Sequence, residues 1–137
     1  MATIARLVPA LILAVAVAGC ATPRGSVQPP PASGERPGSV QTGYASWYGK
    51  RHHGQLTTSG EVYDMNQFTA AHPTLPMGTR LRVTNLQNGR SVEVRVNDRG
   101  PAVHGRILDL SYAAARALGA VQEGVIPVRL RIAPRPP

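Results

Sequence analysis

Hydrophobic and polar residues alternate over several short stretches of this chain. Residues 79–84 place Leu81 and Val83 between arginine and threonine, and residues 91–96 interleave three valines with serine, glutamate and arginine. A period of two puts the apolar side chains on one face, which is typical of a half-buried strand. Asn88-Gly89 separates the two stretches, and this dipeptide favours a type I′ hairpin turn. We therefore predict an antiparallel hairpin here.

The remaining pattern favours further short strands and one helix. Ser111 is a good N-cap, residues 112–118 are rich in alanine, and Gly119 suits the left-handed conformation that ends a helix. Four other stretches are predicted strands, namely residues 43–48, 69–72, 107–110 and 127–132. Many short strands in so small a domain favour a closed barrel of the mainly β class, because closure removes exposed strand edges.

The N-terminal segment has the pattern of a secretion signal. Arg6 precedes residues 7–18, which are apolar apart from Pro9. About 12 such residues are too few to span a bilayer but suit the apolar core of a signal peptide. Small residues then precede Cys20, the single cysteine, in an arrangement that resembles a bacterial lipobox. The alternative is an ordinary signal followed by an incidental cysteine.

A lipobox would make Cys20 the acylated first residue of the mature protein. Two acyl chains on it would anchor the protein firmly to a membrane. Ala21 follows instead of Asp, so resemblance to sorted lipoproteins implies the outer membrane, facing the periplasm. We therefore divide the chain into a signal peptide (1–19), a lipidated cysteine with a Pro/Gly/Ser-rich disordered linker (20–41) and one folded domain (42–134).

The chain is strongly basic, with 15 Lys and Arg against 7 Asp and Glu and a formal net charge of +8. Aromatic residues are few, and no nucleic-acid-binding motif is visible. Outside the cytoplasm such a charge favours acidic wall polymers or anionic lipid as partners, and not nucleic acid. The alternative is that the charge only keeps the domain soluble.

One acid stands out by its position. Asp98 follows the alternating valines of residues 92–96 and precedes Gly100-Pro101, which must turn the chain. A carboxylate at a strand end is held in place yet remains reachable, which suits proton transfer to a substrate. The alternative is that Asp98 only pairs with Arg99 or accepts backbone N–H groups in the turn.

Ordered motifs along residues 43–128 identify the chain as similar to the RlpA-like (rare lipoprotein A) family. The matching motifs are Ala45-Ser46-Trp47-Tyr48-Gly49, His53-Gly54, Thr57-Thr58-Ser59-Gly60-Glu61-Val62-Tyr63, residues 69–79, Val83-Thr84-Asn85-Leu86, Asn88-Gly89-Arg90, Asn97-Asp98-Arg99-Gly100-Pro101 and Asp109-Leu110-Ser111. The resemblance implies a six-stranded double-psi β-barrel with one or two short helices. This chain departs from longer members, which carry a C-terminal glycan-binding domain, because its sequence stops after the barrel segment.

The resemblance also implies septal-ring lytic transglycosylase activity on peptidoglycan glycan strands, with divisome proteins as possible partners. Such an enzyme cleaves the MurNAc–GlcNAc bond without water, and the muramic C6 hydroxyl closes a 1,6-anhydro ring. A hydrolase needs two carboxylates, whereas this intramolecular reaction can run on one that is first acid and then base. The family looks distantly like expansins, so the alternative is a non-catalytic, expansin-like glycan-binding module. A third reading is a structural lipoprotein that bridges membrane and wall.

Residue roles follow from the resemblance and the local sequence. Asp98 matches the catalytic acid, so we expect burial or a neighbouring negative charge to raise its pKa. Glu61 matches the second acid and would raise the pKa of Asp98 or steady the oxocarbenium charge; the alternative is a solvated loop carboxylate. His72 matches an active-site position, where we expect it to hold a loop and not to transfer a proton.

The remaining assignments concern substrate binding. Trp47 and Tyr48 are candidates for a sugar-stacking platform, and alternation along a strand lets only one of them face the core. Arg99 is expected to point away from Asp98 or to bind a substrate carboxylate, and Asn97 of the same motif is also assigned to substrate binding. No cofactor is expected. No metal site is expected either, since the adjacent His52 and His53 would point to opposite faces of a strand. Two further acids receive lesser roles, with Asp109 supporting the helix start and Asp64 unassigned.

Overall fold

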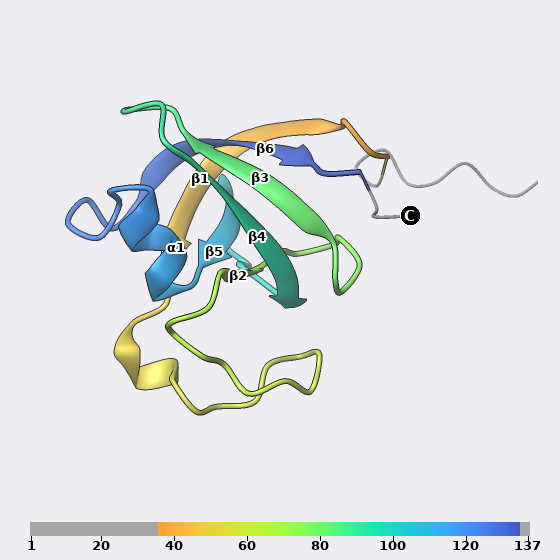
Figure 1. Ribbon diagram of the computed structural model, residues 1–137, viewed down its shortest axis with the longest axis vertical. Helices are drawn as coiled ribbons and strands as arrows, with labels where there is room; N and C mark the ends of the chain where they lie inside the picture. The colour runs from red at the N-terminus through yellow and green to blue at the C-terminus, as the bar shows by residue number, and fades with distance from the viewer. Residues whose placement is uncertain (1–35, 135–137) are drawn as a thin grey trace, which may run out of the picture.

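The computed structural model describes residues 36–134, which form a closed six-stranded barrel in the order β1-β5-β2-β4-β3-β6 (Figure 1). The predicted mainly β barrel is therefore confirmed. The predicted signal peptide, Cys20 and most of the predicted linker lie outside the described residues. The elements are β1 (Val40–Trp47), the 3₁₀ helix η1 (Lys50–His52), β2 (Thr69–Ala71), β3 (Arg80–Asn85), β4 (Ser91–Asp98), β5 (Arg106–Leu110), α1 (Tyr112–Ala117) and β6 (Ile126–Ile132).

Strands that are distant in sequence pair in parallel, while their other neighbours are antiparallel. β1 runs parallel to β5 and antiparallel to β6, and β2 runs parallel to β4 and antiparallel to β5. Apolar side chains that alternate along the strands fill the interior, among them Leu81, Val94 and Leu130. All six strands and this core lie between Val40 and Ile132.

The predicted β3–β4 hairpin is present, but its turn is not type I′. Among the described residues only glycines have positive φ, so Gly89 is left-handed (φ 75°) and Asn88 is not. The chain instead makes a longer loop, in which the Gly89 N–H donates to the Asn85 carbonyl. The side chains of Asn85 and Asn88 both donate to the carbonyl of Leu118, so contact with the end of α1 selects this loop.

The helix begins and ends as predicted to within one residue. The Ser111 hydroxyl accepts the Ala114 N–H at 3.2 Å, and Gly119 has a φ of 65° just beyond the last turn. Asp109 does not support the helix start. Its carboxylate accepts hydrogen bonds from Arg106 and Ser46 instead, because its strand position points it toward their side chains.

The first strand starts earlier than the predicted domain boundary at residue 42. β1 begins at Val40 because Val40 and Gln41 pair with Arg131 and Leu130 of β6. The long connection from β1 to β2 covers one end of the barrel (Figure 1). That connection meets the end of β4, where Asp98 is the last strand residue. No helix among residues 36–134 is long and apolar enough to cross a membrane.

Candidate active site

Asp98 is held by a set of converging donors at the end of β4. Thr58 approaches from the covering connection, and both its backbone N–H (3.0 Å) and its hydroxyl (2.7 Å) donate to Asp98 Oδ1. The Arg99 N–H donates to the same oxygen at 2.9 Å, and the Tyr48 hydroxyl lies 3.4 Å from Oδ2. A carboxylate that accepts this many hydrogen bonds is stabilised in its ionised form.

The pKa of Asp98 is lowered from its usual value, contrary to the prediction from sequence. Partial burial raises the pKa, but the hydrogen bonds from Thr58, Arg99 and Tyr48 favour the carboxylate and outweigh it. These donors come from three segments of the chain, so only the folded structure brings them together. The Asp98 carboxyl group is therefore ionised at neutral pH and accepts hydrogen bonds.

A small pocket of about 40 Å³ opens beside this carboxylate. Its lining consists of Tyr48, His52, Gln55, Leu56, Thr57, Tyr63 and Asp98. The Tyr48 ring meets the Tyr63 ring edge-on at 5.0 Å. Burial raises the pKa of Tyr48, and the negative charge of Asp98 raises it further, so its hydroxyl keeps its proton at neutral pH. The pocket thus places a hydroxyl donor beside an ionised carboxylate.

Trp47 and Tyr48 take different positions, as strand alternation requires. Trp47 packs against the core and lies 5.5 Å from the Tyr112 ring, while Tyr48 lines the pocket. Thr58 and Tyr63 were not singled out from the sequence, although both belong to the motif that contains Glu61. A run of two threonines and a serine before an acid is the signal that could have indicated hydrogen-bond donors to a carboxylate.

Glu61 is engaged by a cation, so it supplies no free negative charge to raise the pKa of Asp98. The Arg95 guanidinium binds both of its oxygens, at 2.6 and 2.9 Å, and the Asn97 amide donates to it at 3.3 Å. The hydrogen bonds from Arg95 and then Asn97 lower the pKa of Glu61. Asn97 itself is buried, so its visible contact is with Glu61 and not with the pocket.

His72 is buried and organises the turn after β2. Its Nδ1 accepts the N–H groups of Thr74 and Leu75, both at 3.1 Å, so its proton resides on Nε2, which donates to Gln41 at 3.0 Å. Burial lowers the pKa of His72 to about 4, and the positive charge of Arg99 contributes. The ring is therefore neutral at physiological pH and holds a loop.

Arg99 reinforces the same turn. Its guanidinium donates to the backbone carbonyls of His72 and Leu75, and it forms no ion pair with Asp98 within the described chain. This is the geometry of the first predicted alternative, in which Arg99 points away from the acid. The structure thus groups Asp98 and Tyr48 at the pocket, whereas Arg99 and His72 stabilise the turn after β2 and do not line the pocket.

A closed six-stranded barrel of mixed strand direction, with one carboxylate clamped at a covered strand end, defines the chain as a double-psi β-barrel of the RlpA-like type. The family model described as "Lytic transglycolase" matches residues 40–130, and the chain belongs to this family. The match spans the whole barrel from the first residue of β1 into β6.

Relatives and solved structures agree with this assignment. The chain is 57% identical over 95 residues to "Endolytic peptidoglycan transglycosylase RlpA" of Vibrio cholerae. The aligned segment covers 69% of this chain and 36% of the relative. It is 60% identical over 91 residues to the protein of that name from Neisseria meningitidis. That alignment covers 66% of this chain and 38% of the relative. The chain thus spans little more than a third of the length of these relatives.

Two solved barrels are similar in structure. A Streptomyces papain inhibitor has a TM-score of 0.60 at 25% identity, covering 73% of this chain and 99% of its own. An expansin of Clavibacter michiganensis has a TM-score of 0.58 at 26% identity, covering 72% and 52%. The barrel therefore occurs in proteins with different functions, and the pocket residues must carry the functional argument.

Proposed function

We propose that this protein is an endolytic peptidoglycan lytic transglycosylase that cleaves the MurNAc–GlcNAc bond and leaves 1,6-anhydro-MurNAc ends. The observation that carries the proposal is the clamped Asp98 at an open pocket shared with Tyr48. Identities of 57–60% to proteins named as endolytic transglycosylases support the same activity. The substrate is a glycan strand, and no cofactor takes part.

The reaction needs one group that first gives and then takes a proton. Asp98 donates a proton to the glycosidic oxygen as the bond from the muramic C1 breaks. The C6 hydroxyl then attacks C1, and its proton returns to the Asp98 carboxylate, so protons and charge balance. Because the nucleophile belongs to the same sugar, its proximity supplies part of the acceleration.

The ionised state of Asp98 suits the second step, and substrate binding prepares the first. A glycan strand lying over the pocket excludes water from Asp98, and burial raises the pKa of a carboxyl group. Tyr48 keeps its hydroxyl proton and can donate a hydrogen bond within the site. Glu61 does not line the pocket; paired with Arg95, it accepts a hydrogen bond from Asn97 and so holds the residue that precedes Asp98.

The activity is tested with purified sacculi and residues 21–137, which contain the complete barrel. Mass analysis of the released fragments should show 1,6-anhydro ends with the parent protein, and at least about a hundredfold fewer with Asp98→Asn. Glu93→Gln removes one negative charge away from the pocket and should release fragments at the parental rate. Equal release by the parent and by Asp98→Asn would contradict the assignment of the acid.

The likeness to an expansin favours a second candidate, a non-catalytic glycan-binding module. This candidate predicts that the protein binds sacculi and creates no new anhydro ends. Product analysis therefore separates the two functions, whereas binding alone does not.

We also propose that Cys20 is acylated and tethers the barrel to the outer membrane from the periplasmic side. The small residues before Cys20 and the Pro/Gly/Ser-rich segment after it support this proposal. Metabolic labelling with a palmitate analogue, which Cys20→Ala should abolish, tests it.

A further inference from the structure

Three arginines that the pocket does not use lie together on the outside of the barrel. Arg82 of β3 and Arg131 of β6 are direct cross-strand partners, and Arg129 lies two residues from Arg131 on the same face. All three side chains are exposed. Like charges placed directly opposite each other repel, so an anion bound between them relieves a local electrostatic cost.

These arginines are not neutralised by neighbours within residues 36–134. The acidic partners described there are taken by other cations, with Arg80 bound to Glu93, Arg95 to Glu61 and Arg106 to Asp109. Glu93 lies directly across from Arg82, but Arg80 binds its carboxylate at 3.0 Å. The face therefore retains an excess of positive charge.

Exposed apolar side chains border the same arginines on β1. Val40 pairs with Arg131 and is 48% exposed, and Tyr44, two positions beyond Thr42 on the same outward face, is 53% exposed. We call Val40, Tyr44, Arg82, Arg129 and Arg131 the basic face. Arginine beside exposed aliphatic and aromatic side chains is the composition of a surface that binds the headgroup region of an anionic membrane.

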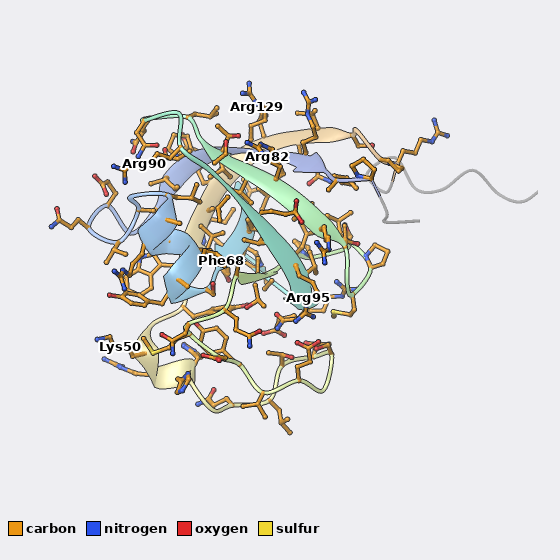
Figure 2. All side chains as sticks on the ribbon, in the orientation of Figure 1. Lys50, Phe68, Arg82, Arg90, Arg95 and Arg129 are labelled. Carbon is orange, nitrogen blue, oxygen red and sulfur yellow. The ribbon has the colours of Figure 1, made fainter. Side chains whose placement is uncertain are left out.

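The basic face and the pocket occupy different sides of the barrel. Figure 2 shows Arg82 and Arg129 together at one edge, and Lys50, in the connection that lines the pocket, at the other. The chain leading from Cys20 enters the barrel at Val40, which belongs to the basic face. A tether that starts at Cys20 would therefore join the barrel at the edge of the basic face.

We propose that the basic face docks on anionic phospholipid headgroups, so that the barrel lies on its membrane with the pocket directed away from the lipid. The proposal rests on the tether argued above, and it adds an orientation that a flexible tether alone does not impose. Surface arginines each contribute attraction that salt screens, and Tyr44 contributes a part that salt does not screen.

The test measures co-sedimentation of residues 21–137 with vesicles of phosphatidylcholine, with and without phosphatidylglycerol. The parent should bind only the anionic vesicles, and Arg82→Gln/Arg129→Gln/Arg131→Gln should bind them roughly ten- to a hundredfold more weakly. The matched control, Lys50→Gln/Arg51→Gln/Arg116→Gln, loses the same charge elsewhere and should bind like the parent. Tyr44→Ser should weaken binding while leaving its salt dependence unchanged.

Three results would overturn the proposal. The parent could fail to bind anionic vesicles, or both triple variants could lose binding equally, which would reduce the effect to net charge. The Arg82/Arg129/Arg131 variant could also keep vesicle binding and lose binding to sacculi, which would identify acidic wall polymer as the partner. Thermal melts of each variant establish that the barrel is folded. Vesicle binding does not depend on Asp98, so it fails or succeeds independently of the proposed enzymatic activity.

Discussion

The hydroxyl of Thr58 lies 2.7 Å from Asp98 Oδ1, and the backbone N–H of the same threonine donates to the same oxygen. One residue of the covering connection therefore makes two of the contacts that keep Asp98 ionised. The position of this connection determines how readily the acid takes up a proton.

Replacing Thr58 by valine should raise the pKa of Asp98, because the change removes one donor to the carboxylate and preserves side-chain shape. A general acid works only below its own pKa, so the activity of the variant should extend to higher pH than that of the parent. Carbon-detected NMR titration of the Asp98 carboxyl measures the shift without any turnover. Thr58→Ser keeps the hydroxyl and should restore the parental titration; an unchanged pKa in the valine variant would refute the clamp.

Stability should fall as pH drops from about 6.5 to about 4, through the titration of His72. The folded pKa is about 4 against an ordinary value of 6.5, so in this range the unfolded state binds more protons and folding loses free energy. The stabilisation is present above pH 6.5, and about 3 kcal/mol is lost on acidification to pH 4. Urea unfolding across this range measures it.

The variant His72→Asn tests whether His72 causes this dependence of stability on pH. The asparagine oxygen can replace Nδ1 as the acceptor for Thr74 and Leu75, but the side chain does not titrate. The variant should be less stable at neutral pH, because the bond to Gln41 is lost, and its stability should change little between pH 6.5 and 5, above the range in which the carboxyl groups titrate. A slope equal to that of the parent would assign the titration to another group.

Arg95→Gln should clearly lower the release of anhydro ends but should change the free energy of unfolding only slightly. The Arg95–Glu61 pair is largely exposed, so its loss should cost less than about 1 kcal/mol of unfolding free energy. The rate at which anhydro ends are released should fall well below that of the parent, because Glu61 loses the partner that fixes its position. Arg80→Gln breaks the comparable pair with Glu93 away from the pocket and should leave activity unchanged. Equal losses in both variants would mean that the position of Glu61 has no part in the reaction.

Asn85→Ala should destabilise the barrel by about 2–3 kcal/mol. Asn85 is 1% exposed, and its amide joins the β3–β4 loop to the Leu118 carbonyl and to the Gln87 N–H. Asn88→Ala removes an exposed donor to the same carbonyl and should cost less than half as much. Urea unfolding of both variants measures the two losses of unfolding free energy. Similar losses would show that the burial of Asn85 does not increase its contribution to stability.

Periodicity was sufficient to predict the six strands and α1, but not the 3₁₀ helix η1, which contains His52 where a strand was expected. Alternation in residues 79–84 and 91–96, with a glycine turn between them, predicts a hairpin in almost any context, and Ser111 and Gly119 define a helix locally. The type of the hairpin turn was predicted wrongly, because Asn85 and Asn88 bind Leu118, a contact that lies about thirty residues away in sequence.

The sequence by itself determined the strand pattern, the helix ends and the position of Asp98 at a strand end, because each depends on neighbouring residues. Tertiary structure decided the closure of the barrel, the charge state of Asp98 and the engagement of Glu61 by Arg95. It also decided which arginines remain without an acidic partner in the described chain. These properties depend on pairings such as β1 with β5 and Thr58 with Asp98. Electrostatic effects act through space over a few ångströms, and only folding brings these groups within that distance.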